Sequence, residues 1–148
     1  MMTFIEYLKT LSPADWNKMA TPKWTVHDVV AHMVGWEKRD AEIIPIYWAK
    51  KKREPWMSTR EEWDAFNRKE VEERKDHSSQ QLIEEWEMWQ KKAAEEVKKI
   101  GYDNMKARPD IFDWLFGGED NKGGAYTLSE GGSHYEHHYE QIKQALNI

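Results

Sequence analysis

Histidines gather near the end of this chain, in the stretch GGSHYEHHYEQIKQAL (residues 131–146). The chain has six histidines, and three of them, His134, His137 and His138, lie in this stretch. Helical positions four residues apart share a face, so His134 and His138 form a pair one turn apart. Two imidazoles in this arrangement can bind one metal ion. They can also be buried neutral groups satisfied by a hydrogen bond, and the pair alone leaves that alternative open.

An earlier histidine is the natural third ligand. His32, in the segment WTVHDVVAHMVGWE, falls on the shoulder of the apolar face of a predicted helix, in a stripe with Val29 and Trp36. It therefore points toward neighbouring helices. By contrast, His27 lies opposite that face and is expected to be solvated, and His77 is interpreted as a surface residue in a charged turn. Three neutral imidazoles would leave a divalent ion an open position, which is typical of a catalytic metal site.

Two polar residues are candidates to orient these ligands through their other ring nitrogens. Asp28 lies one turn before His32, and Gln141 follows the late pair. The alternatives are that Asp28 caps its helix and that Gln141 makes an ordinary contact between helices. Zinc and nickel both suit imidazole, and iron and manganese remain open. No catalytic residue is assigned, because the chain has no cysteine and its nucleophile would be water or the thiol of a cosubstrate.

Aromatic residues offer material for a pocket wall. The chain has nine tryptophans, and large rings bury a large area each. Trp24, Trp36 and Trp114 could wall a pocket beside the histidines. The alternative for each is that it fills the core.

Four main helices are predicted to position these residues. Capping residues and apolar stripes indicate helices over 25–50, 58–75, 79–100 and about 126–146. Pro45 is expected to kink or end the first of them. The second is highly charged and is expected on the outside. The third carries the clearest stripe, which consists of Leu82, Trp86, Trp89, Ala93, Val97 and Ile100.

The predicted architecture is a single all-α domain over residues 1–148. Residues 101–125 contain Pro109 and paired glycines, and they are expected to form a long irregular loop before the last helix. Several amphipathic stripes are most simply buried in an antiparallel four-helix bundle.

Composition excludes several classes of function. The net charge is −5, from 22 basic and 27 acidic residues, and an acidic domain lacks the basic footprint that nucleic acids require. The basic run KKKR (Lys50 to Arg53) is compensated by the acidic residues that follow. No stretch of about 18 apolar residues predicts a membrane span, and no signal peptide is recognised. The absence of cysteine fits a cytoplasmic protein.

These segments resemble the DinB/YfiT-like superfamily. WTVHDVVAHMVGWE resembles the opening of its second helix, and HYEHHYEQI resembles its last-helix motif of two histidines followed by glutamine and isoleucine. The intervening WDAFNRKEVEERKDHSSQQLIEEW is similar to the branch with maleylpyruvate isomerase-type N-terminal domains. The resemblance covers nearly the whole chain. It implies an up–down–down–up four-helix bundle, often a homodimer, with one divalent metal ion held by His32, His134 and His138.

The resemblance also bears on function, because some members of the family transfer low-molecular-weight thiols or isomerise thiol adducts. We therefore expect a metal-dependent thiol transferase or hydrolase acting on a small electrophilic molecule. The alternative is a non-catalytic bundle that binds or sequesters a small ligand in stress. A weaker alternative is a module that docks a partner protein through its acidic helices.

Overall fold

Helices make up most of the described part of the chain. The structure is a computed structural model that describes residues 2–50, 59–108 and 133–147; for residues 133–135 it describes the backbone alone. An isolated β-bridge joins Met19 and Thr25, and the residues described include no strand, so the all-α prediction is confirmed. The helices are α1 (Phe4–Lys9), α2 (Pro13–Trp16), α3 (Val26–Lys50), α4 (Arg60–Glu73), α5 (Ser79–Ile100), α6 (Tyr102–Lys106) and α8 (Ser133–Leu146).

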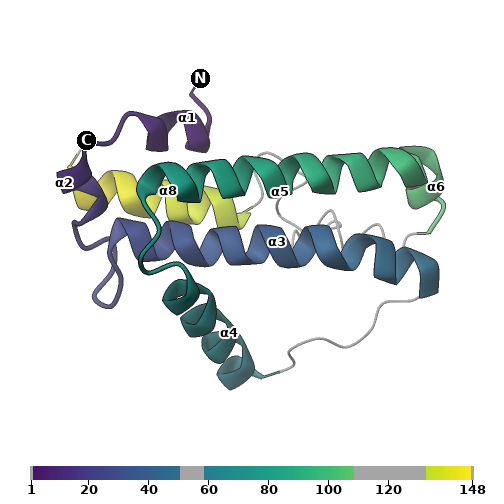
Figure 1. The fold of residues 1–148 in the computed structure, drawn as a ribbon, viewed down its shortest axis with the longest axis horizontal. Coiled ribbons are helices and arrows are strands. Elements are labelled where there is room, and N and C mark those ends of the chain that lie inside the picture. Colours follow the sequence, from purple (N-terminus) through teal and green to yellow (C-terminus); the bar gives the residue numbers. More distant parts are fainter. Residues whose placement is uncertain (1, 51–58, 109–132, 148) are drawn as a thin grey trace.

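The two longest helices, α3 and α5, lie side by side and run in the same direction (Figure 1). Contacts fix this parallel direction, because Glu37 in α3 binds Trp86 in α5, while further along both helices Ile44 shares a cluster with Ala93. The helix α8 runs the opposite way. The arrangement is therefore not a simple antiparallel succession, because α3 and α5 are parallel. The helix α4 lies between them in the sequence and connects them.

The main core is formed where α1, α3, α5 and α8 meet. Its buried side chains include Val30 of α3, Trp86 of α5 and Ile142 of α8. The short helix α1 covers this region, and the Phe4 ring meets the Trp86 ring edge-on with centres 5.5 Å apart. Burying side chains of this size supplies most of the driving force for folding. A second, smaller cluster lies toward the other end of α3 and is formed by Ala41, Ile44, Ala93 and Met105.

The helix α4 lies obliquely against α3 rather than along it (Figure 1). Gly35 permits this approach, because a Cβ at this position would lie 2.5 Å from Cγ of Glu70. The Glu70 carboxylate is bound in turn by Arg74, whose Nε also donates to Glu85 of α5 at 2.8 Å. Both Glu70 and Arg74 are buried. The contact at Gly35 and this ion-pair network fix α4 against the rest of the molecule.

The helix α3 continues through Pro45 to Lys50, so the alternative that it ends at Pro45 was wrong. The helix α6 occupies part of the stretch expected to be irregular, whose remainder from residue 109 lies outside the described residues. The backbone of α8 is helical from Ser133, and residues 126–132, where its start was expected, also lie outside them.

The expected solvation of His27 was also wrong. Its side chain is half-buried, and its Nε2 lies 2.6 Å from the carbonyl oxygen of His77. A carbonyl oxygen can only accept, so Nε2 donates. This contact ties the start of α3 to the turn before α5.

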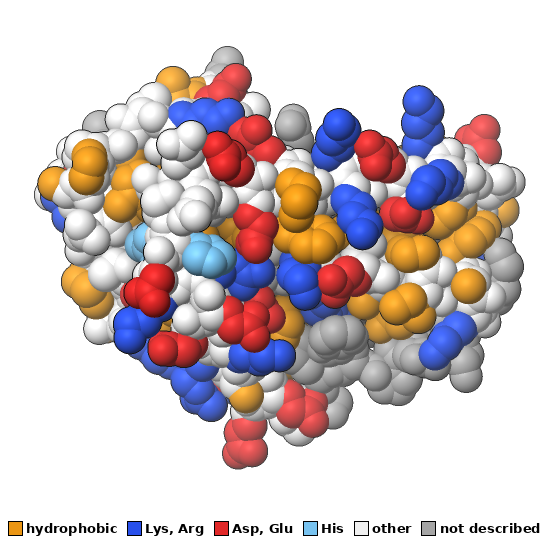
Figure 2. Space-filling model, in the orientation of Figure 1, with side chains coloured by type: hydrophobic (Ala, Val, Ile, Leu, Met, Phe, Trp, Pro, Cys, Tyr) orange, Lys and Arg blue, Asp and Glu red, His pale blue; other side chains and the backbone are white. Residues whose placement is uncertain are grey.

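The surface shows no single-sign patch on the face drawn in Figure 2, where acidic and basic side chains are interspersed. Hydrophobic side chains lie between them. Of the helices described, none has the length and apolarity needed to cross a membrane.

Candidate metal centre

The first candidate ligand, His32, is positioned by the start of α3. Thr25 and Asp28 bind each other's backbone N–H groups at 3.1 Å, which caps the helix two turns before the histidine. The segment before α3 forms a tight turn, in which the Ala20 N–H donates to the Trp24 carbonyl at 2.9 Å. As a result, the Trp24 ring lies 4.9 Å from the ring of His32, centre to centre.

The second candidate ligand, His138, is positioned by the packing of α8. Ile142 and Leu146 bury in the core, one and two turns further on. The neighbouring Tyr139 stacks on Phe4 of α1, with ring centres 5.1 Å apart. These anchors hold the rotation of α8 about its axis, so that His138 points to α3. The adjacent His137 is exposed.

The rings of His32 and His138 meet between the two helices. Their centres are 4.7 Å apart and their planes are inclined by 81°. Both side chains are buried, with 2% and 9% exposure. Two imidazoles that bind one ion through Nε2, at bonds of about 2.0–2.1 Å, hold their ring centres about 5 Å apart. The observed separation therefore fits a pair of ligands to a single ion.

Each of these rings directs its Nδ1 at an oxygen atom. The Nδ1 of His32 contacts the carbonyl oxygen of Val29, one turn earlier in α3. The Nδ1 of His138 lies 3.0 Å from Oε1 of Gln141. Donation from Nδ1 fixes the tautomer in which Nε2 carries the lone pair, which is the arrangement found in histidine ligands. Gln141 thus occupies the position expected of a ligand-orienting residue, whereas Asp28 caps α3.

Burial also sets the protonation state of His138. Desolvation is the largest of the effects that lower the pKa of His138 to about 4; the hydrogen bond to Gln141 opposes it, and nearby His137 adds a smaller lowering. The ring is consequently neutral at physiological pH. A metal ion binds the neutral imidazole.

The third predicted ligand, His134, lies in the first turn of α8, one turn before His138. Its side chain is outside the described residues. Among the side chains that the structure describes, no three His, Cys, Asp or Glu residues form a group that could hold a metal ion. The structure thus brings two of the three predicted ligands together, and the third stays a prediction.

A cavity of about 740 Å³ opens beside the histidine pair. His32, His138, Gln141 and Trp24 are among the residues that line it. This volume is in the range of sites that hold a small molecule. The three tryptophans predicted as possible pocket walls have different positions. Trp24 lines the cavity, whereas Trp36 is buried and is not among its lining residues. Trp114 lies outside the described residues.

Residues of α4 also line the cavity. Arg60, Trp63 and Asn67 all line it, and their spacing of three to four residues places them on one helical face. The sequence interpretation assigned this charged helix to the exterior and missed its inner face. The signal that could have revealed this face is the run of large and amide side chains at Trp63, Phe66 and Asn67 within an otherwise charged segment.

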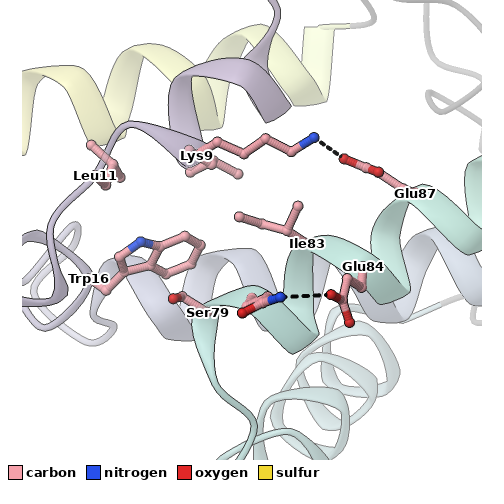
Figure 3. Close-up of a pocket in the computed structure, with 9 residues that line it drawn as sticks. Lys9, Leu11, Trp16, Ser79, Ile83, Glu84 and Glu87 are labelled. Carbon is pink, nitrogen blue, oxygen red and sulfur yellow. Dashed lines mark hydrogen bonds and ion pairs between the residues drawn. The ribbon is translucent and has the colours of Figure 1, made fainter.

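A second hollow lies between α1, α2 and α5 (Figure 3). It has a volume of about 410 Å³, and its apolar side chains include Trp16 and Ile83. An ion pair between Lys9 and Glu87 spans its rim. No histidine is among the residues that line this second hollow.

Together, the fold and these contacts define an all-α protein with a pair of buried histidines on the wall of a cavity. A family model of the DinB superfamily matches residues 2–142. The chain therefore belongs to the DinB superfamily. Comparisons with curated proteins and with solved structures gave no match.

Proposed function

We propose that this protein is a divalent-metal-dependent enzyme, a thiol transferase or hydrolase that acts on a small electrophilic molecule. In this proposal His32, His134 and His138 hold one ion, with zinc or nickel as the best candidates for an imidazole set. The scaffold is the four-helix bundle of the family. The observation that carries the proposal is the close approach of His32 and His138, whose ring centres lie 4.7 Å apart on the wall of a cavity.

The chemistry follows from the donor set. A divalent ion bound by neutral imidazoles supplies a Lewis acid and brings the pKa of a bound water or thiol toward neutrality. The chain supplies no thiol of its own, because it has no cysteine, so a thiol nucleophile would arrive as a cosubstrate. The residues of the chain would orient the ligands through Gln141 and shield the reacting groups with Trp24.

An activity assay with and without a chelator tests this proposal. Purified protein is loaded with zinc or nickel and given chlorodinitrobenzene as electrophile with a panel of low-molecular-weight thiols, and separately a nitrophenyl ester with water. We expect turnover above background that is lost with chelator and restored by the metal. Turnover that is indifferent to chelation would contradict the metal-dependent mechanism.

A non-catalytic role is the second candidate, and the aromatic lining of the cavity favours it. Trp24 and Trp63 both line the cavity, and such side chains bind small apolar molecules without chemistry. This role predicts that a small ligand binds with unchanged affinity after chelation and is recovered unmodified. The two candidates therefore differ in the fate of the ligand and in the effect of the chelator.

A further inference from the structure

We propose that the cavity selects small aromatic carboxylates, with Arg60 and Lys23 binding the anionic group and Trp63 and Trp24 contacting the flat apolar part. This inference adds a ligand class to the proposed function. It rests on that function only for the question of whether the bound molecule reacts. Binding itself depends only on the cavity walls. The inference can therefore be tested separately from the metal.

The charge of the cavity differs in sign from that of the chain. The chain has a net charge of −5. Among the described residues that line the cavity, however, Lys23 and Arg60 are cationic and Asp64 is the one acidic residue. Positive side chains at the wall of a partly enclosed site raise the local concentration of anions. An anionic ligand is therefore favoured over a neutral or cationic one of the same shape.

The guanidinium of Arg60 is suited to a carboxylate. Its Nε lies 3.2 Å from Oδ1 of Asp64, one turn further along α4. The terminal nitrogens are not part of that contact, and planar guanidinium groups bind carboxylates through paired N–H donors. Asp64 both holds the side chain near the cavity and competes with a ligand for its charge. Removing this competitor is therefore expected to strengthen the binding of an anion.

The apolar walls come from two separate elements. Trp63 is 45% exposed, a large fraction for a ring of this size, and it lines the cavity from α4. The ring of Trp36 packs against that of Trp63, with the two ring centres 4.9 Å apart. Trp36 is fixed in turn because its Nε1 donates to Oδ1 of Asn67 at 2.8 Å. Trp63 is thus a supported aromatic surface that faces a hollow, which suits stacking on a flat ligand.

Calorimetric titration of naphthoate and naphthamide tests the inference. The two probes share the aromatic body and differ in the charge of the polar group. Protein stripped of metal with a chelator and dialysed is titrated with each. We expect naphthoate to bind about five-fold more tightly than naphthamide, as for an exposed charge pair. Equal affinities, or no binding of either probe, would overturn the proposal.

Variants assign the parts of the site. Arg60→Gln should lower the affinity for naphthoate about five-fold and leave the affinity for naphthamide unchanged. The matched control is Arg68→Gln, because Arg68 is exposed on α4 and does not line the cavity. This control should change neither affinity. Trp63→Leu should weaken both probes by roughly three- to ten-fold. Asp64→Asn should strengthen naphthoate alone. Loss of naphthoate affinity in Arg68→Gln equal to that in Arg60→Gln would overturn the assignment.

The same titrations separate this inference from the proposed function. A preference for naphthoate in stripped protein supports the anionic site even if no turnover is detected in any assay. Conversely, metal-dependent turnover combined with equal affinity for the two probes supports the enzyme and overturns the anionic site.

Discussion

Two sets of polar side chains are buried on α3, and they differ in what lies beside them. His32 faces His138 and a cavity. One to two turns later, Glu37 and Asp40 are each 1% exposed. The Oε1 of Glu37 accepts from Trp86 Nε1 at 2.9 Å, and Asp40 pairs with buried Arg39 at 3.4 Å. Neither Glu37 nor Asp40 is among the residues that line the cavity.

This difference distinguishes the candidate binding site from a structural cluster of buried polar side chains. Burial raises the pKa of Glu37 well above its usual range, and the nearby Asp40 carboxylate raises it further, against the hydrogen bond from Trp86. Perturbed groups of this kind occur in structural networks as well as at functional sites. What distinguishes the histidines is the convergence of two rings from different helices on an accessible hollow. The following predictions test that distinction.

The largest effect is expected from removing a ligand. His32→Ala and His138→Ala should each weaken the binding of zinc by more than about 100-fold, because loss of a ligand exceeds the cost of losing an orienting group. Zinc affinity is measured by competition with a chromogenic chelator in protein that has no histidine tag. The control is His137→Ala, which removes an exposed neighbour of His138. Equal losses in all three variants would contradict the site.

A smaller loss is expected at Gln141, whose Oε1 accepts from His138. Gln141→Leu keeps a side chain of similar size but removes the acceptor, and it should weaken zinc binding by about 10- to 100-fold. Gln144→Leu is the matched control, because Gln144 lies exposed on the same helix. If Gln141→Leu retains the full zinc affinity, the orienting role is refuted while the ligand pair stands.

Gly35→Ala tests whether α4 closes the cavity through its approach to α3. The added Cβ would meet the Glu70 side chain at 2.5 Å, so α4 must shift. We expect a loss of about 1–3 kcal/mol in the free energy of unfolding, as for other overpacked sites, although alanine is the better helix former. Urea denaturation measures this loss. A variant as stable as the parent would show that the two helices are not held in this contact.

The smallest effect is expected from Glu37→Gln, and it reports on stability instead of binding. The folded state holds the Glu37 proton more tightly than the unfolded state, so stability falls as pH rises above the usual glutamate pKa of 4.5. Glutamine removes this loss, so the variant should gain stability relative to the parent as pH rises toward 7.5, with the gain vanishing near pH 4.5. Denaturation across this pH range measures the effect, and zinc affinity should not change. A gain that is independent of pH would contradict the raised pKa.

The helices that could be predicted are those whose ends are set locally. Both ends of α5 fall where they were expected, because Ser78 and Gln81 form a capping box and Gly101 adopts a φ of 90°. The helix does not end at Pro45, which was one of the expected outcomes; the Pro45 side chain faces solvent while Ile44 and Tyr47 near it are buried. Burial of these neighbours outweighs the lost backbone hydrogen bond, and this cannot be read from local propensity.

Half of the candidate site was within reach of the sequence. The shared face of His134 and His138 and the inward tilt of His32 follow from helical periodicity. Periodicity does not set how far one helix slides along another, however, so the approach of His32 to His138 needed the structure. The side chains of Trp63, Phe66 and Asn67 indicate an inner face on α4, but the contact at Gly35 that brings α4 against α3 cannot be read from the sequence of α4.

The central claim is that one divalent ion is held by His32, His134 and His138, and anomalous X-ray diffraction tests it most directly. Crystals of the tag-free protein are grown with zinc, and data are collected on both sides of the zinc absorption edge. The account predicts one strong peak per chain, about 2.0–2.1 Å from Nε2 of each of the three histidines. A map with no peak between α3 and α8, or with zinc bound only elsewhere, would contradict it.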